Sequence, residues 1–211
     1  MIAIIKYNAG NITSVQNALT KLGYESIITD DPETILNAQK VIFPGVGEAS
    51  TAMSYLNERG LNEVILSVTQ PFLGICLGLQ LMCKSTEENN TQCLGIFGTE
   101  VKLFPPEEKV PHMGWNNFTN LKGSLFDELN ISNDVYYVHS YYAEQCKYTI
   151  ATCNYIKPFS AALQKNNFYA TQFHPEKFTV LQLGKGIKKT ANYPLFVDKG
   201  GGSSKGDKKG G

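Results

Sequence analysis

The sequence predicts an α/β fold of three layers, with a mostly parallel central sheet and antiparallel additions in the second half. Two observations predict it. Apolar runs typical of buried strands alternate with helical patterns over residues 2–83, and repeated strand–helix units form parallel sheets covered on both faces. Beyond residue 100, turns instead of helices separate the apolar runs. With 42% hydrophobic residues, the 211-residue chain can bury one sizeable core.

The first half contains four predicted strands and four predicted helices. In the segment 13–22 apolar residues recur at helical spacing, and Gly23 ends it. Asp31 before Pro32 is typical of a helix start. The predicted strands are 2–7, 26–29, 41–43 and 71–75, and the predicted helices are 13–22, 32–36, 48–56 and 77–83.

The second half is predicted to contain strands joined by turns. The sequence Lys165-Asn166-Asn167 between two apolar runs is typical of a hairpin turn. Strands joined in this way are antiparallel, so they extend the parallel sheet with a different pairing. The predicted strands are 101–103, 135–138, 148–155, 161–164 and 168–173.

Three segments are expected along the chain. Residues 1–177 carry the alternating patterns and form the predicted domain, and residues 178–198 form an atypical segment that is partly helical at most. Residues 199–211 are rich in glycine and lysine, lack apolar side chains and are expected to be disordered. A basic arm for an anionic partner is the alternative for this tail, but it has no interleaved aromatic residues.

Composition limits the classes of function. The net charge is zero and the pI is near 6.8, which does not favour nucleic acid as a partner. The five cysteines form neither a Cys-x-x-Cys pair nor a zinc pattern, so no metal is expected. The glycines at 45 and 47 are too few for a dinucleotide fingerprint and no P-loop pattern is present, so no cofactor is expected either. Without a signal peptide or a membrane-spanning run, the expected location is the cytoplasm.

Cys76 stands where a predicted strand meets a predicted helix. Gly74 precedes it and Gly78 follows in the first helical turn, which is the pattern of a strand–turn–helix elbow that exposes a nucleophile. A thiol at a helix N-terminus also lies near the positive end of the helix dipole, which favours the reactive thiolate. The alternative is an ordinary turn in which the glycines only allow close packing.

His174 favours the catalytic interpretation. It follows an apolar strand, and Glu176 comes two positions later, so in an extended chain both would lie on one side. The carboxylate could then orient the imidazole toward Cys76, which would complete a thiol–imidazole–carboxylate triad. His112 and His139 are rival bases, but neither has a carboxylate at this spacing.

Acyl transfer would also need hydrogen-bond donors for an oxyanion. The backbone N–H of Leu77, directly after the nucleophile, is one predicted donor. The segment Pro44-Gly45-Val46-Gly47 follows another strand, and its glycines would let the backbone of Val46 and Gly47 approach a substrate. The alternative is a simple Pro-Gly turn.

These motifs resemble a known family. The segment Gly74-Ile-Cys-Leu-Gly-Leu-Gln80, together with His174-Pro-Glu176, resembles the class I triad glutamine amidotransferases, which have a flavodoxin-like three-layer fold. Further segments are similar to the glutaminase subunits of imidazole glycerol phosphate synthase, an enzyme of histidine biosynthesis. They are residues 10–15, 44–47, 111–116, 137–141 and 172–177. From Phe178 onward the chain departs from the family pattern.

The resemblance implies a reaction and a partner. Cys76 would attack glutamine, His174 would transfer the proton and Glu176 would orient the imidazole. Ammonia would then pass to a (β/α)₈-barrel cyclase, the second subunit of a heterodimer, which makes imidazole glycerol phosphate and aminoimidazole carboxamide ribotide. Glutamine would be held by Gly47, Gln80, Glu88, Ser140 and Tyr141, and the cyclase would be contacted by Asn11, Trp115, Tyr136 and Lys177.

Three alternatives stay open at this point. The chain could supply ammonia to another synthase, for example in amino-sugar synthesis, because the glutaminase half does not contact the acceptor. It could be a non-catalytic regulatory module of the same fold, or an independent thiol hydrolase. Labelling of Cys76 by an electrophilic glutamine analogue separates the module from the enzymes.

Overall fold

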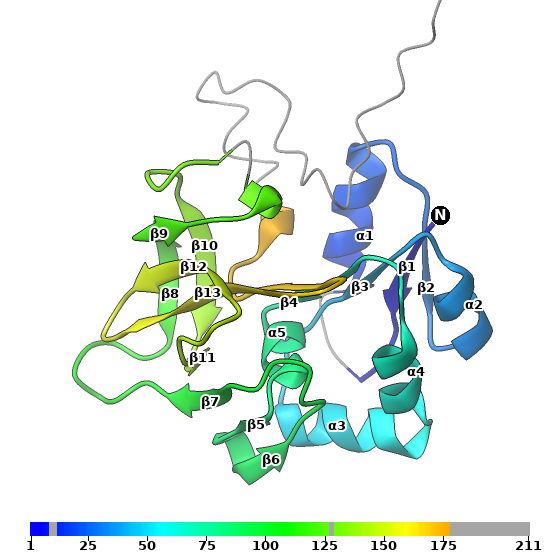
Figure 1. Ribbon diagram of the computed structural model, residues 1–211, viewed down its shortest axis with the longest axis horizontal. Coiled ribbons are helices and arrows are strands. Elements are labelled where there is room, and N and C mark those ends of the chain that lie inside the picture. Colours follow the sequence, from blue (N-terminus) through cyan, green and yellow to red (C-terminus); the bar gives the residue numbers. More distant parts are fainter. Residues whose placement is uncertain (9–11, 127–128, 178–211) are drawn as a thin grey trace, which may run out of the picture.

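The computed structural model describes residues 1–8, 12–126 and 129–177. Its central sheet has eight strands in the order β2-β1-β3-β4-β14-β13-β12-β9. Neighbours from β2 to β14 pair in parallel, and the remaining pairs are antiparallel, as predicted (Figure 1). The strands are β1 Ile2–Ile5, β2 Ser26–Thr29, β3 Lys40–Phe43, β4 Phe72–Ile75, β9 Asn120–Leu121, β12 Thr149–Asn154, β13 Pro158–Lys165 and β14 Phe168–Thr171.

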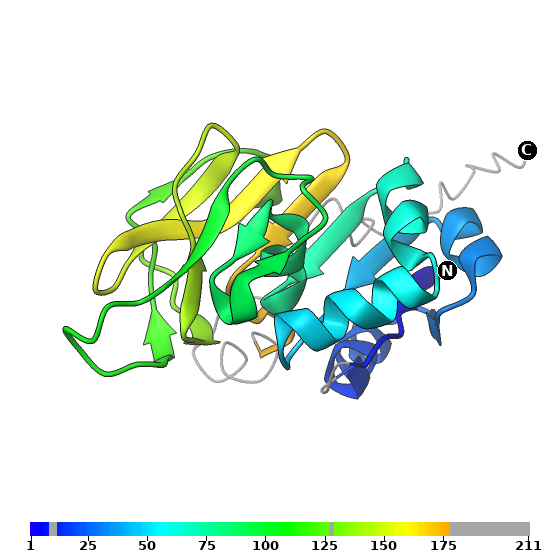
Figure 2. The same cartoon turned by 90° about the horizontal axis from the view of Figure 1, so that it is seen from below.

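Both faces of this sheet are covered. Along β1, Ala3 and Ile5 belong to one buried cluster, whereas Ile2 and Ile4 belong to another on the opposite face. Figures 1 and 2 show α3 and α4 on one side of the sheet and α1 on the other. The helices are α1 Ile12–Lys21, α2 Pro32–Asn37, α3 Ala49–Glu58, α4 Leu61–Ser67 and α5 Leu77–Met82, with 3₁₀ turns η1 Glu88–Asn90, η2 Ser124–Phe126 and η3 Pro175–Lys177.

Two smaller sheets lie beside the central one. In one of them β10 pairs antiparallel with β8, and in the other the strand order is β11-β7-β5-β6. They lie beside the antiparallel half of the central sheet, whereas α1 to α4 lie beside its parallel half (Figure 1). Their strands are β5 Ser85–Thr86, β6 Thr91–Gln92, β7 Glu100–Leu103, β8 His112–Asn116, β10 Val135–His139 and β11 Tyr141–Ala143.

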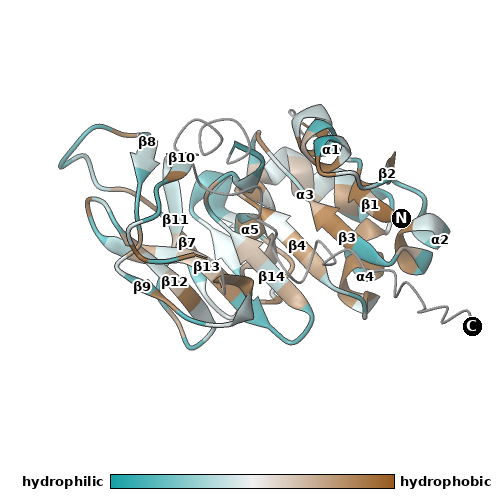
Figure 3. Cartoon of the chain, turned by 90° about the horizontal axis from the view of Figure 1, so that it is seen from above, coloured by the Kyte–Doolittle hydropathy of each residue, from teal (hydrophilic) through white to brown (hydrophobic). Residues whose placement is uncertain are grey.

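The predicted elements are confirmed apart from their ends, and several others were missed. The strands β1, β3 and β4 are buried along almost their whole length and stand out as hydrophobic in Figure 3. The helix α4 and the strands β8 and β11 were not predicted. The strand β8 contains a glycine and no β-branched residue, so its strand signal in the sequence is weak. Asn11 and residues 178–211 lie outside the described residues.

Among the described residues, no helix has the length and apolar character needed to cross a bilayer. All five cysteines are free thiols, and Cys76, Cys83 and Cys153 are buried. Within the same residues, no group of three histidine, cysteine or acidic side chains is arranged to hold a metal ion.

Gly78 allows α5 to pack directly against the sheet. A Cβ added at this position would meet the carbonyl group of Phe43 in β3, which is backbone and cannot rotate away. Gly74 in β4 faces the backbone of Gly78 from the other side, at a distance where an added Cβ would lie 3.0 Å from it. The two glycines therefore bring the start of α5 close to β3 and β4 and set the position of Cys76 between them.

We predict that Gly78→Ala destabilises the protein, because its Cβ would push α5 away from β3. Overpacking of this kind costs about 1–3 kcal/mol of the free energy of unfolding. Gly98→Ala is the matched control, since a Cβ there meets no atom of the described residues within 4 Å. Urea denaturation of both variants checks this prediction, and equal stability of the two would contradict it.

Candidate active site

Cys76 occupies a strained turn between β4 and α5. Its backbone angles are φ 53° and ψ −105°, a conformation that a residue with a side chain rarely adopts. Hydrogen bonds on both sides hold it there: the Cys76 N–H donates to Thr171 O at 2.7 Å, and its carbonyl accepts from Gln80 N at 3.2 Å. The predicted elbow is confirmed, and the thiol lies at the carboxyl end of the sheet.

The parallel pairing of β14 with β4 brings the C-terminal motif to the same place. Thr171 is the register partner of Ile75, so both chains leave the sheet at one edge. The Glu176 carboxylate then accepts from His174 Nδ1 at 2.8 Å, and both side chains are only 4% exposed. The predicted contact between His174 and Glu176 is present, but the extended chain that was predicted to produce it is wrong. Residues 175–177 form a 3₁₀ turn instead of an extended chain, and this turn swings the carboxylate back to the imidazole.

Burial and two neighbours control the charge of His174. Burial by itself lowers the pKa of His174, but the neighbouring Cys76 sulfur and Glu176 carboxylate outweigh burial and raise this pKa to about 10. Among the described residues, His174 Nε2 has no hydrogen-bond partner of normal geometry, although it is buried. Cys76 nevertheless raises the pKa of this imidazole, and hydrogen bonds within catalytic pairs often form fully only when substrate binds.

The rival bases form a neutral buried pair. His112 Nδ1 and His139 Nε2 lie 3.1 Å apart, and His139 Nδ1 donates to Tyr141 O at 2.7 Å. Burial lowers the pKa of His112 to about 4 and that of His139 to about 3. The two rings pack among aromatic side chains, including Tyr137 and Phe159. They are core residues, which leaves His174 as the histidine arranged as a base.

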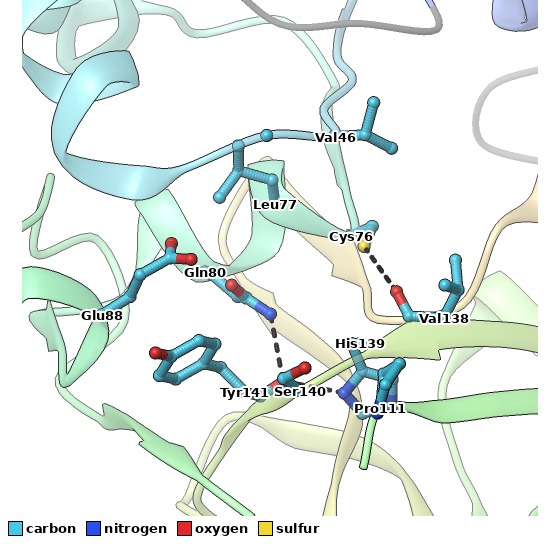
Figure 4. Close-up of a pocket in the computed structure, with 11 residues that line it drawn as sticks. Val46, Cys76, Leu77, Gln80, Glu88, Pro111, Val138, His139, Ser140 and Tyr141 are labelled. Carbon is cyan, nitrogen blue, oxygen red and sulfur yellow. Dashed lines mark hydrogen bonds between the residues drawn. The ribbon is translucent and has the colours of Figure 1, made fainter.

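A pocket opens directly in front of Cys76. It has a volume of about 310 Å³, in the range of small-molecule sites. All five residues predicted to bind substrate contribute to its lining, and Figure 4 shows Gln80, Glu88, Ser140 and Tyr141 around it. Glu88 also accepts a hydrogen bond from Ala49 N at 2.7 Å, which anchors its carboxylate, and burial raises the pKa of Glu88.

The predicted oxyanion donors are close to Cys76, but one of them is occupied. The Leu77 N–H donates to Gly45 O at 3.3 Å, so the Gly45 carbonyl stands where an oxyanion would bind. Val46 and Gly47 line the pocket on this side, and Gly47 has a positive φ of 137°. The Tyr7 hydroxyl donates to Pro44 O and so holds the start of this loop in place. An open oxyanion site would require the Gly45–Val46 peptide to turn.

Gln172 belongs to the motif at residues 172–177, but the sequence alone predicted no role for it. Its Nε2 donates to Cys76 Sγ at 3.6 Å, and its Oε1 accepts from Gln80 Nε2 at 3.2 Å. Gln172 is fully buried. The sequence could have predicted this position, because Gln172 directly follows β14 just as Cys76 directly follows the paired strand β4.

Three of the four predicted interface residues lie together away from the pocket. Trp115 on β8 is 42% exposed and packs edge-to-face on Tyr136 of the neighbouring β10, with ring centroids 5.5 Å apart. Lys177 Nζ lies 5.1 Å from the centroid of the same Tyr136 ring. We call these three residues the Trp115 cluster. The fourth, Asn11, lies outside the described residues.

Known proteins are similar to this chain in sequence and in fold. The sequence model of the class-I glutamine amidotransferase family matches residues 3–187. Imidazole glycerol phosphate synthase subunit HisH from Bacteroides fragilis (strain YCH46) is 59% identical over 83% of this chain and 91% of its own length. Subunit HisH 2 from Legionella pneumophila subsp. pneumophila (strain Philadelphia 1) is 46% identical over 84% and 90%.

A solved glutamine amidotransferase structure adds a likeness in fold alone. It has a TM-score of 0.66 at 17% sequence identity and covers 84% of this chain and 92% of its own. The sequence matches and this fold agree with the elbow at Cys76 and the pocket in front of it. The chain therefore belongs to the class-I glutamine amidotransferase family, among the HisH subunits of imidazole glycerol phosphate synthase.

Proposed function

We propose that Cys76, His174 and Glu176 hydrolyse glutamine in this glutaminase subunit and that the ammonia passes to a cyclase subunit in histidine biosynthesis. The observation that carries the proposal is that β4 and β14 end at the same edge of the sheet, so Cys76 emerges beside a buried imidazole whose Nδ1 lies 2.8 Å from the Glu176 carboxylate. Neither the thiol nor the imidazole alone would indicate acyl transfer, but together they supply a nucleophile and a proton carrier.

The reaction follows from the positions of these groups. The Cys76 thiolate attacks the side-chain amide carbon of glutamine, and the protonated His174 gives its proton to the departing nitrogen. Ammonia leaves, and a γ-glutamyl thioester remains on the sulfur. Water then attacks the thioester while His174 takes a proton, so glutamate leaves and the thiol–imidazole pair is restored. Glu176 keeps the imidazole oriented in both steps.

The pocket residues suit an amino acid with a free α-ammonium group. Glu88 presents a carboxylate that can pair with this cation, and its bond from Ala49 N keeps it in place. Ser140 and Tyr141 line the opposite wall and offer polar groups, and Gly47 leaves room for the substrate backbone. Gln80 is held by Tyr141 O at 3.1 Å, so it reaches the pocket from a fixed position.

The partner is proposed to be a (β/α)₈-barrel cyclase that docks on the Trp115 cluster and Asn11, forming a heterodimer. Free ammonia is largely protonated at neutral pH and then not nucleophilic, so direct transfer between subunits is an advantage. The exposed indole and the cation–aromatic stack provide an anchor of the kind that dominates interfaces. The cyclase would release imidazole glycerol phosphate and aminoimidazole carboxamide ribotide.

A coupled assay tests this function. The chain alone is expected to hydrolyse glutamine slowly, because the Gly45 carbonyl occupies the Leu77 donor. Addition of the cyclase and its nucleotide substrate is expected to increase the rate by about 100-fold or more, the value of one oxyanion donor. Cys76→Ala is expected to abolish glutamine-dependent synthesis and to leave ammonia-dependent synthesis by the cyclase unchanged.

Each alternative has its own outcome in this assay. Full glutaminase activity without the cyclase would identify an independent hydrolase. Stimulation by another synthase in place of the cyclase would identify a different acceptor. A Cys76 that an electrophilic glutamine analogue does not label, even with the cyclase and its ligand present, would identify a non-catalytic module.

The raised pKa of His174 predicts a pH-dependent stability. The pKa is 6.5 in the unfolded chain and about 10 in the folded protein, so the proton on His174 stabilises the fold. This contribution is complete below pH 6.5 and is lost as the pH rises toward 10. Denaturant titrations of the parent and of His174→Gln should therefore show a stability difference that shrinks over this range. A difference independent of pH would contradict the prediction.

The Trp115 cluster predicts the docking surface. Trp115→Ala and Lys177→Ala are each expected to weaken cyclase binding by about 10-fold or more, because both remove part of one exposed stack. Lys147→Ala is the matched control, since Lys147 Nζ also lies 5.1 Å from an aromatic ring, that of Tyr148, but away from the cluster. Isothermal titration calorimetry with the cyclase measures the three affinities. Equal loss in all three variants would reject this surface.

A further inference from the structure

The sulfur of Cys76 has a buried neutral donor as well as the imidazole. Gln172 Nε2 lies 3.6 Å from Sγ, and the Val138 carbonyl lies 3.9 Å from it on another side. A carbonyl can only accept, so it favours the protonated thiol, whereas an amide N–H favours the thiolate. The two contacts therefore act in opposite directions on the charge of the sulfur.

The orientation of the Gln172 amide follows from its neighbours. The Tyr141 carbonyl accepts only, so the Gln80 nitrogen must face it, and that nitrogen also faces Gln172 Oε1 at 3.2 Å. An amide whose oxygen accepts from Gln80 has to turn its NH₂ group toward the sulfur. The donor at Cys76 is therefore set by a chain of two hydrogen bonds that begins at a backbone carbonyl.

Burial makes this donor effective. Gln172 is 0% exposed and Gln80 is 5% exposed, so solvent does not compete for the bond to the sulfur. A hydrogen bond to an ionised acceptor is about twice as strong as one between neutral groups. An amide also keeps its proton when His174 gives one to departing ammonia. The two residues thus differ in role: His174 transfers the proton, and Gln172 supports the anion without titrating.

We propose that Gln172 is a further catalytic residue of this enzyme, which stabilises the Cys76 thiolate through its Nε2–H, and that Gln80 is a positioning residue that keeps this amide oriented. The proposal rests on the glutaminase function proposed above. Gln80 then has a second role besides lining the pocket, because it hydrogen-bonds to Gln172, which in turn contacts the Cys76 sulfur.

Alkylation of Cys76 tests the proposal without substrate. The full chain in complex with the cyclase is treated with iodoacetamide, a neutral electrophile, over a range of pH, and modification of the peptide that carries Cys76 is followed by mass spectrometry. In Gln172→Met, which keeps the length but removes the donor, the pH midpoint of the alkylation rate is expected to rise by about one unit or more. In Gln172→Glu, where an acceptor replaces the donor, it is expected to rise as well.

Turnover gives a second readout. For Gln172→Met, kcat/KM for glutamine is expected to fall by about 10- to 100-fold, mostly through kcat, because the lost bond is to the reacting atom. Gln164→Met is the matched control. Its half-buried amide lies on the neighbouring strand β13 and donates to Tyr169 Oη, away from Cys76, so both readouts should stay at parent values.

The outcomes separate the two proposals. An unchanged alkylation midpoint in Gln172→Met, with a lower melting temperature alone, would reduce Gln172 to a packing residue and overturn the inference. If that variant does not fold, Gln172→Glu decides in the same way through the same midpoint. A parent complex that alkylates normally but hydrolyses no glutamine would overturn the proposed function instead, because the alkylation profile does not depend on turnover.

Discussion

The active site depends on one parallel strand pair, β4 with β14. Pairing of Ile75 with Thr171 makes both strands end at the same level, so the residues after each strand emerge side by side. Cys76 comes from one strand end and His174 from the other, almost 100 residues later in the chain. The hydrogen bond from Cys76 N to Thr171 O, at 2.7 Å, joins the two ends directly. A shift of one residue in this register would separate nucleophile and base.

The three histidines near this strand pair differ in charge. His112 and His139 are kept neutral by burial, whereas Glu176 and Cys76 together keep a proton on His174. Burial alone would make all three histidines neutral, so the neighbouring carboxylate and thiol account for the difference. The site therefore concentrates positive charge on one imidazole, between the sulfur and the Glu176 carboxylate, and keeps the other two histidines uncharged.

The proposed docking surface and the triad share structural elements. The His174 N–H donates to Tyr136 O at 3.0 Å, and the Tyr136 side chain lies in the Trp115 cluster. Lys177 follows the triad carboxylate directly and stacks on the same ring. A partner bound there would contact the strand and the turn that hold the catalytic histidine. The Gly45 carbonyl, near Cys76, accepts the hydrogen bond from the Leu77 N–H. This arrangement suits a site in which binding of the partner frees the Leu77 donor for the oxyanion.

The sequence by itself determined the strand–helix alternation, the elbow at Cys76 and the candidate triad, because these depend on periodicity and on glycines at short range. The hairpin at residues 165–167 was also readable, since Asn166 takes the positive φ such turns need. Only the tertiary structure decided that His112 and His139 form a neutral core pair, that a 3₁₀ turn brings Glu176 to His174, and that Gln172 faces the sulfur. Those facts depend on which strand ends become neighbours and on what burial does to each charge, and long-range pairing determines both.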